Sequence, residues 1–211
     1  MKPWRRAERT LIERLRTPEA VQRHLRALPY NRERAGETLR GFRGVVRHRT
    51  AHCLEAALFS ATVLEQHGYP PLVLSFESQD GLDHVLYVFR RDVDRGPWGA
   101  VARSRDEGLH GRAPVYRSAR DLAASYIDPY VDKTGRITGF AVVDLRALGR
   151  YDWRQGEQNL WKVERHLIEQ PHARLAMSNA RYDALHRRYL AWRALHPTAP
   201  PDYYDRTTHW W

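Results

Sequence analysis

The sequence predicts a single α+β domain in which a helix carrying the only cysteine packs on a small antiparallel sheet. Small and apolar residues dominate every face of residues 53–64, which is typical of a buried helix, and Gly68 can end it. Segments 72–76 and 84–90 are rich in strand-forming residues, and the second alternates between two faces. Apolar residues beyond position 150 return to helical spacing. A length of 211 residues suits one domain.

The first part of the chain, residues 1–48, is predicted to be a basic helical prelude. Thr17 can cap the free amides of a helix that begins at Pro18, and the segment 29–31 ends that helix. Apolar residues recur at helical spacing in two stretches, first at Val21, Leu25 and Leu28 and then at Leu39, Phe42, Val45 and Val46. Two helices are therefore expected before the cysteine.

The predicted core comprises residues 49–145 and begins with the cysteine helix, in whose first turn Cys53 lies. The later elements of this core are a strand at 72–76, hairpin arms at 84–90 and 98–104, a loop containing Gly108, Gly111 and Pro114, a short helix at 122–126 and a strand at 138–145. The helix is expected to lie against the sheet that these strands form.

A C-terminal helical extension and tail, residues 150–211, completes the predicted domain. Its apolar side chains occur at helical spacings, at Leu160, Val163 and Leu167 and again at Tyr182, Leu185, Tyr189 and Trp192. Two amphipathic helices separated near Pro171 are expected, followed by a tail rich in proline and aromatic residues.

The composition restricts the compartment and the partners. A single cysteine cannot close an intramolecular disulfide, and the charged first residues do not resemble a signal sequence, so a cytoplasmic protein without a membrane span is expected. The net charge is +10. Such a surface could attract an acidic protein or nucleic acid through the arginine-rich helices, but the basic residues are scattered rather than clustered in blocks.

Cys53 and His84 are the candidate nucleophile and base. The thiolate is the attacking form of cysteine, and positive potential at a helix N-terminus or beside an imidazolium favours that form. Cys53 is expected to lie at such a helix N-terminus. His84 begins a predicted strand that faces the helix, which is a rigid way to bring an imidazole to the sulfur.

The hairpin predicts where a third residue would orient the imidazole. With a turn centred between residues 94 and 95, position 105 lies opposite His84, and Ser104 and Asp106 flank that position. A carboxylate would stabilise the imidazolium better than a hydroxyl, but both residues stay open. No metal and no cofactor is expected, because one cysteine and scattered histidines lack the paired spacings of zinc sites.

Three stretches of residues 40–145 resemble the transglutaminase-like superfamily, a branch of the papain-like cysteine fold. They are HCLEAALFSATVLEQHGY, with the cysteine at a helix start, then DHVLYVF, with a histidine at a strand start, and then WGAVARSRD. The chain is most similar to bacterial proteins of transglutaminase-like type. The resemblance implies a Cys, His, Asp triad in this order, and so Cys53, His84 and Asp106.

The same resemblance implies a function. It predicts cysteine-dependent acyl transfer or hydrolysis of a peptide or protein amide. The backbone amide of Cys53 is a candidate donor to the oxyanion. The aromatic residue that helps in classical transglutaminases has no counterpart directly before the cysteine, so Arg47 and His52 are the side-chain candidates there. The alternative is a catalytically inactive papain-like scaffold that binds an acidic partner or nucleic acid through its basic surface.

Overall fold

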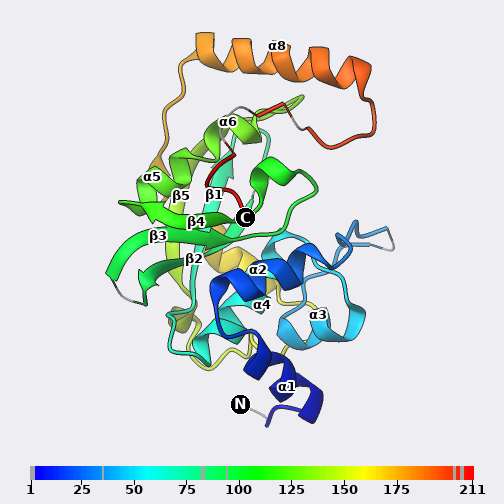
Figure 1. The fold of residues 1–211 in the computed structure, drawn as a ribbon, viewed down its shortest axis with the longest axis vertical. Coiled ribbons are helices and arrows are strands. Elements are labelled where there is room, and N and C mark those ends of the chain that lie inside the picture. Colours follow the sequence, from blue (N-terminus) through cyan, green and yellow to red (C-terminus); the bar gives the residue numbers. More distant parts are fainter. Residues whose placement is uncertain (1–2, 35, 82–83, 94, 202, 205–206) are drawn as a thin grey trace.

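A computed structural model of the chain describes residues 3–34, 36–81, 84–93, 95–201, 203–204 and 207–211. These residues form a six-stranded antiparallel sheet in the order β4-β3-β2-β1-β5-β6, with helices on both faces (Figure 1). The strands are β1 Leu72–Ser78, β2 Val85–Asp92, β3 Arg95–Val101, β4 Arg112–Tyr116, β5 Ile137–Asp144 and β6 Ala173–Arg174.

The helix that carries the cysteine packs on this sheet, and the predicted α+β class is confirmed in that respect. The α-helices are α1 Arg6–Arg14, α2 Pro18–Arg26, α3 Phe42–His48, α4 Cys53–Glu65, α5 Ala119–Ala124, α6 Ile127–Tyr130, α7 Trp161–Ile168 and α8 Asn179–Leu195. Two 3₁₀ turns, η1 Glu107–Leu109 and η2 Leu145–Leu148, follow β3 and β5. Helix α4 is buried at every position from Leu54 to Leu64, as its composition predicts.

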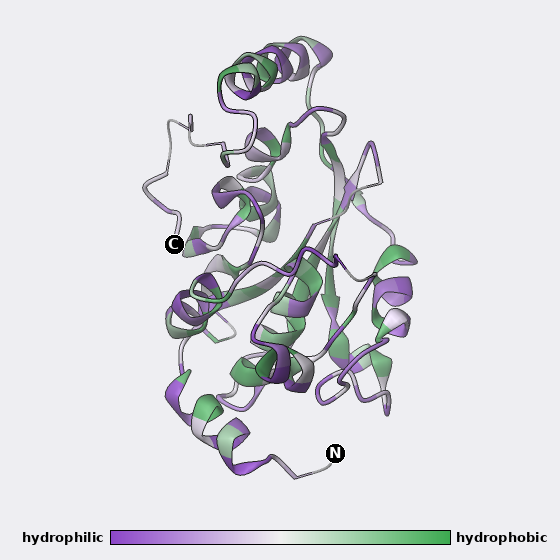
Figure 2. Ribbon diagram, turned by 90° about the vertical axis from the view of Figure 1, so that its right-hand side faces the viewer, coloured by the Kyte–Doolittle hydropathy of each residue, from purple (hydrophilic) through white to green (hydrophobic). Residues whose placement is uncertain are grey.

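Each face of the sheet has its own apolar core. On β2, the side chains of Val85, Tyr87 and Phe89 join the core around α4, whereas Leu86 and Val88 join the core beneath α5. Figure 2 shows hydrophobic residues along the strands and along the central helix. Because each fully buried aliphatic or aromatic side chain contributes roughly 1.5–3 kcal/mol, the first of these cores fixes α4 relative to the strands.

The N-terminal helices pack around α4 and include one more helix than expected. The Thr17 hydroxyl accepts a hydrogen bond from the Ala20 amide at 3.2 Å, so the predicted cap at the start of α2 forms. Helix α1 precedes it, and its buried Glu8 forms an ion pair with Arg43 of α3, with 2.7 Å between Arg43 Nε and Glu8 Oε1. This pair ties the first helix to the helix before the cysteine.

The hairpin of β2 and β3 differs from prediction by one residue in register. Tyr87 lies opposite Val101, and the register shifts between Arg90 and Asp92. Asp92 pairs with Arg95 next to the turn, so the hairpin turns one residue earlier than predicted, and pairing from that turn would place residue 103 opposite His84. The register shift, typical of a bulge, moves that position to 104. Continuing the observed pairing would place Ser104 opposite His84, but β3 ends at Val101.

The segment expected to be a loop after β3 contains the edge strand β4. Arg112 of β4 is fully buried, with its guanidinium 4.1 Å from the ring centre of Tyr126 and 4.4 Å from that of Trp210. The chain end therefore returns to the sheet, where the Ala113 amide donates to the His209 carbonyl at 2.8 Å. Neither β4 nor the return of the chain end produces a periodic pattern of apolar residues, so the sequence gives no sign of them. Pro114 is tolerated in β4 because this strand lies at the edge of the sheet.

The C-terminal extension contains the two predicted helices, separated by β6, but they pack differently. Helix α7 buries Val163 and Leu167, whereas α8 has no buried residue and lies apart from the sheet (Figure 1). Instead, an ion pair of 2.6 Å between Arg181 and Asp128 connects α8 to α6. Within the described ranges, no helix combines the length and apolar character needed to cross a bilayer.

Candidate functional site

Cys53 is the first residue of α4 and its side chain is partly exposed. The amides in the first turn of a helix have no carbonyl partner within the helix, and they place a partial positive charge at this end. The buried body of α4 fixes the sulfur at the end of the sheet. The sequence predicted this position.

The imidazoles of His52 and His84 both act on the thiol. Burial opposes ionisation, but hydrogen bonds and charge interactions with His52 and His84 outweigh it and lower the pKa of Cys53 to about 5. At neutral pH the sulfur is therefore a thiolate. The predicted spatial pair of Cys53 and His84 is present, and the adjacent His52 adds a second imidazole.

His84 immediately precedes β2 and is held on several sides. Its carbonyl accepts from the Phe76 amide at 2.9 Å, which joins it to the end of β1. Its ring is nearly parallel to the ring of Phe76, at 6.3 Å between centres. Its Nε2 donates to the Leu109 carbonyl at 3.0 Å. That hydrogen bond leaves Nδ1 as the nitrogen for the sulfur.

The group behind the imidazole is thus a main-chain carbonyl, and neither Asp106 nor Ser104 takes the place predicted for it. Ser104 is buried, and its hydroxyl accepts from the Asp106 amide at 3.3 Å. Asp106 precedes η1, where burial raises the pKa of its carboxyl. Its charge acts on His84 through space, but no hydrogen bond joins these two side chains in the described part of the chain. The early end of β3 explains the difference.

Substitution of Asp106 tests this geometry. Because Leu109 supplies the acceptor through its backbone, Asp106→Asn should leave the pH midpoint of Cys53 alkylation by iodoacetamide within about half a pH unit of the wild-type value. Replacing a carboxylate that orients the imidazole by an amide would instead raise the midpoint by about one unit or more. The pH dependence of the second-order rate constant distinguishes the two cases, with the melting temperature as a check on folding.

His52 is the N-cap residue of α4 and is the one predicted oxyanion residue that lies beside the sulfur. Burial lowers its pKa, but the hydrogen bond to Cys53 and the charges of Cys53 and Glu55 outweigh burial and raise the pKa to about 9. Its Nε2 donates to the Thr38 carbonyl at 2.8 Å. His52 is therefore a fixed imidazolium at neutral pH, and it balances the thiolate charge.

Arg47, the other predicted oxyanion residue, is occupied elsewhere. It lies in the last turn of α3, where its exposed guanidinium forms an ion pair with Glu157 at 2.8 Å. Within the described residues it makes no contact with Cys53. The two residues are close in sequence, but a turn in which Arg49 adopts a left-handed conformation separates α3 from α4.

Tyr30 is a site residue that the sequence did not identify. Its strand-like pairing with Ala51 brings it beside the start of α4, and the Asn31 amide donates to the Ala51 carbonyl at 3.1 Å. Burial, followed by the charge of Cys53, raises the pKa of its phenol, so the hydroxyl keeps its proton. Tyr30 thus places an aromatic ring beside Cys53, although it belongs to a loop 23 positions earlier in the chain.

A groove adjoins the thiol. It has a volume of about 620 Å³, and its walls are the segment 29–38 and the segment 103–105. Tyr30 and Thr38 line it, and these residues interact with Cys53 and His52 respectively. The groove therefore borders two residues that interact with the site.

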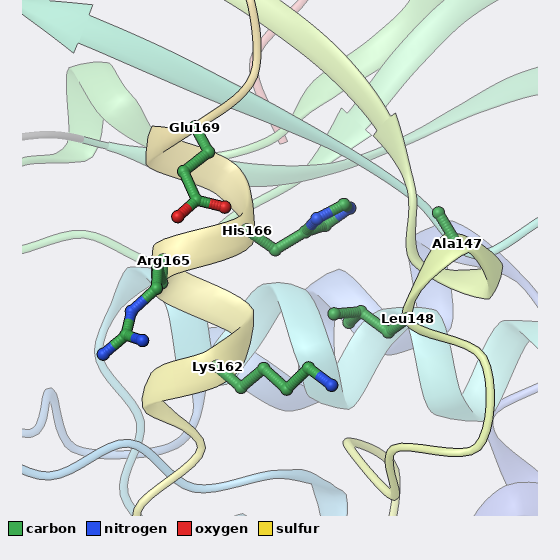
Figure 3. Close-up of a pocket in the computed structure, with 6 residues that line it drawn as sticks. All are labelled: Ala147, Leu148, Lys162, Arg165, His166 and Glu169. Carbon is green, nitrogen blue, oxygen red and sulfur yellow. The ribbon is translucent and has the colours of Figure 1, made fainter.

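Another cavity, of about 370 Å³, lies between η2 and α7 (Figure 3). The figure shows His166 and Lys162 pointing toward Ala147 and Leu148, and neither a thiol nor a hydroxyl lines the cavity. Among the residues that the structure describes, no three His, Cys, Asp or Glu side chains are grouped so as to hold a metal ion. The groove beside Cys53 is accordingly the stronger candidate for chemistry.

Comparison with known proteins assigns no role to this site. No protein-family model matches the chain, and no curated protein matches it closely enough to transfer a role.

Proposed function

We propose that this protein is a cysteine-dependent acyltransferase or amide hydrolase, with Cys53 as nucleophile and His84 as general base and acid. One observation carries the proposal: a partly exposed cysteine at a helix start interacts with an imidazole, which lowers the pKa of its thiol, and Nε2 of that imidazole is held by the Leu109 carbonyl. An activated nucleophile, a base within reach and a group that orients the base together define this kind of catalytic unit.

The first half-reaction forms a thioester. The Cys53 thiolate attacks the carbonyl carbon of an amide, and the carbonyl π electrons move to oxygen. As the tetrahedral intermediate collapses, the C–N bond breaks and His84 gives its Nδ1 proton to the departing amine. The acyl group is then bound to sulfur.

The second half-reaction releases the acyl group. His84 takes a proton from water or from an acceptor amine, which attacks the thioester carbon and expels the thiolate. Water gives hydrolysis and an amine gives transamidation. Both outcomes return Cys53 and His84 to their starting charges.

Two kinds of donor support the oxyanion in this proposal. The Cys53 amide is at the N-terminus of α4, where the helix provides no acceptor. The Tyr30 hydroxyl and the His52 imidazolium are both close enough to interact with Cys53. Removal of one such donor typically costs about 10²–10³ in kcat.

We further propose a transglutaminase-like, papain-like arrangement for this core. The order of a cysteine at a helix start followed by a histidine before a strand supports it. So does the packing of α4 on an antiparallel sheet.

Acylation by p-nitrophenyl acetate tests the proposal. We expect transfer of an acetyl group to the peptide containing Cys53, detected by mass spectrometry, together with a burst of nitrophenolate. After the burst, the slower release of nitrophenolate reports hydrolysis of the acetyl thioester, and His84→Ala should slow this phase about 10²–10⁴-fold, as general-base removal does. Exposed His48 on α3 provides the matched control, and His48→Ala should leave both phases unchanged.

A different result would contradict the proposal. If Cys53 reacts no faster than glutathione and His84→Ala has no effect, the thiol is not activated. The binding-scaffold alternative would then be the better account of this fold.

A further inference from the structure

The groove beside Cys53 is lined by more positive charge than the protein neutralises. Arg32, Arg34, Arg103 and Arg105 line it, and Glu33 is its one acidic lining residue. Arginine stays protonated at all ordinary pH values, so four cations surround one cavity of about 620 Å³. This local density of positive charge is higher than the average for the chain, whose basic residues are otherwise scattered.

Glu33 does not neutralise these arginines, because its carboxylate is already engaged. Its Oε1 accepts from the Thr38 amide at 2.7 Å and from the Thr38 hydroxyl at 3.4 Å. The same oxygen lies 3.8 Å from Nε2 of His52. Glu33 thus stabilises the wall of the groove and the imidazolium beside the sulfur.

Three of the arginines are free to bind an anion. Arg32, Arg34 and Arg105 are exposed, and none forms an ion pair with a residue in the described ranges. They lie on both walls, two on the segment before Gly36 and one on the segment after β3. An extended ligand between the walls would therefore meet cations on either side.

Arg103 is fixed at the inner end of the groove without a carboxylate. Its Nη1 and Nη2 donate to the carbonyls of Ser104 at 2.6 Å and Leu28 at 3.1 Å. Its Nε is buried and has no acceptor in the described residues. Burial and then the charge of Arg103 lower the pKa of the neighbouring His110 to about 4, so this imidazole is neutral and adds no positive charge. The charge of Glu107 acts on Arg103 through space, but no ion pair with a carboxylate is formed by this partly buried guanidinium in the described part of the chain.

We propose that this groove binds a carboxylate-bearing peptide segment and so selects acyl substrates with acidic residues next to the amide that Cys53 attacks. The inference rests on the function proposed above and adds the substrate class to it. The groove shares Tyr30 and Thr38 with the surroundings of Cys53 and His52, so a peptide whose amide is at the sulfur can place its neighbouring residues in the groove. Arginine forks match carboxylate geometry, and charge-assisted hydrogen bonds of this kind are the strong ones.

A peptide suits the geometry better than a polynucleotide does. Polynucleotide binding uses a stripe of basic residues that follows the phosphate backbone, usually with aromatic side chains on which bases stack. Here the arginines surround a single cavity, and the one aromatic ring that lines it, Tyr30, is already covered by Arg103, with 5.7 Å between guanidinium carbon and ring centre.

Alkylation of Cys53 by charged reagents tests the inference without a known substrate. The probes are iodoacetyl-Glu-Glu-amide and iodoacetyl-Gln-Gln-amide, with iodoacetamide as the reference. In each case the thiolate forms an S–C bond with the methylene carbon and iodide leaves with the bonding electrons. At low salt we expect the acidic probe to react about tenfold faster than the neutral one, and the ratio should fall as salt screens the charges.

Two matched triple variants assign the preference to the groove. R32Q/R34Q/R105Q should reduce the rate ratio to about one, whereas R9Q/R16Q/R187Q removes the same charge from exposed positions outside the groove and should keep the ratio. Melting temperatures report on folding, and R105Q alone, with an intermediate ratio expected, serves if the first triple variant is unstable. Oligoglutamate should compete for the site better than an oligonucleotide of equal charge.

The outcomes separate this inference from the proposed function. Equal rates for the two dipeptide probes would overturn the acidic-substrate inference while leaving a His84-dependent iodoacetamide reaction intact. A ratio that falls equally in both triple variants would also overturn it, because net charge would then be the cause. Better competition by the oligonucleotide would replace the peptide with a nucleic acid.

Discussion

Cys53 should be alkylated by iodoacetamide with a pH midpoint near 5, far below that of an ordinary cysteine. The lowered pKa of about 5 comes from hydrogen bonds and charges of two imidazoles acting against burial. The protonated thiol does not react, so the rate should rise as pH increases through this midpoint and be constant by neutral pH. A free cysteine, with a pKa of about 8.5, would still gain rate above pH 7.

At mildly acidic pH, the alkylation rate of Cys53 relative to that of glutathione follows from two opposing factors. At pH near 6 the thiolate fraction of Cys53 exceeds that of free cysteine about 300-fold, given the pKa difference. A less basic thiolate is also a weaker nucleophile, by about 40-fold over this pKa range. The net expectation is a rate about tenfold above that of glutathione at that pH.

Variants of the two histidines give the diagnostic comparison. Without one of the imidazoles the thiol loses a hydrogen bond and a nearby positive charge, so His84→Ala or His52→Ala should raise the midpoint by about 1–3 pH units. His48→Ala on the exposed face of α3 should leave it in place. A wild-type midpoint near that of free cysteine would contradict the thiolate and, with it, the proposed nucleophile.

The local patterns around Cys53 and His84 were sufficient to predict where each lies in the fold. A run of small and apolar residues fixes α4, and a continuous apolar run buried on both faces fixes β2, because burial determines both patterns. The order of the two residues then brings them to one end of the sheet. These parts of the structure depend on side chains that the sequence displays directly.

The remaining site depends on contacts with no side-chain signature. The acceptor for His84 is the Leu109 carbonyl, and any residue type has a carbonyl. Tyr30 reaches Cys53 because a loop pairs with Ala51, which no short-range pattern announces. The hairpin turns one residue earlier than predicted and then contains a bulge, and neither feature has a sequence pattern that would distinguish Ser104 from Asp106.

Glu55 connects the parts of the site that come from different segments. It is fully buried in the first turn of α4 and accepts hydrogen bonds from Asn31 at 3.1 Å and from the Thr38 hydroxyl at 3.0 Å. It also accepts from the His52 amide at 3.2 Å. Its main partner is Arg40, with distances of 2.5 Å from Nε and 2.9 Å from Nη2. The groove wall and the start of α4 are therefore held by one carboxylate.

Arg40→Met should lower the free energy of unfolding at neutral pH by about 3–5 kcal/mol, because it leaves the Glu55 charge buried without its partner. Arg47→Met removes the exposed ion pair with Glu157 and should cost no more than about 1 kcal/mol. Arg40→Met/Glu55→Gln should recover part of the loss, since neither charge is then buried. Urea unfolding measures all three.

The pH dependence of this loss identifies its cause. In the wild type, burial raises the pKa of Glu55, but the hydrogen bond of Arg40 and the charges of His52 and Arg40 outweigh burial and lower it. Without Arg40, two of these interactions are lost and the folded-state pKa of Glu55 rises above its wild-type value. The folded variant then binds a proton at a higher pH than the folded wild type does, so its deficit should shrink as pH falls through the raised pKa. A deficit that is the same at pH near 7 and near 5 would mean that lost packing, and not an uncompensated carboxylate, destabilises the variant.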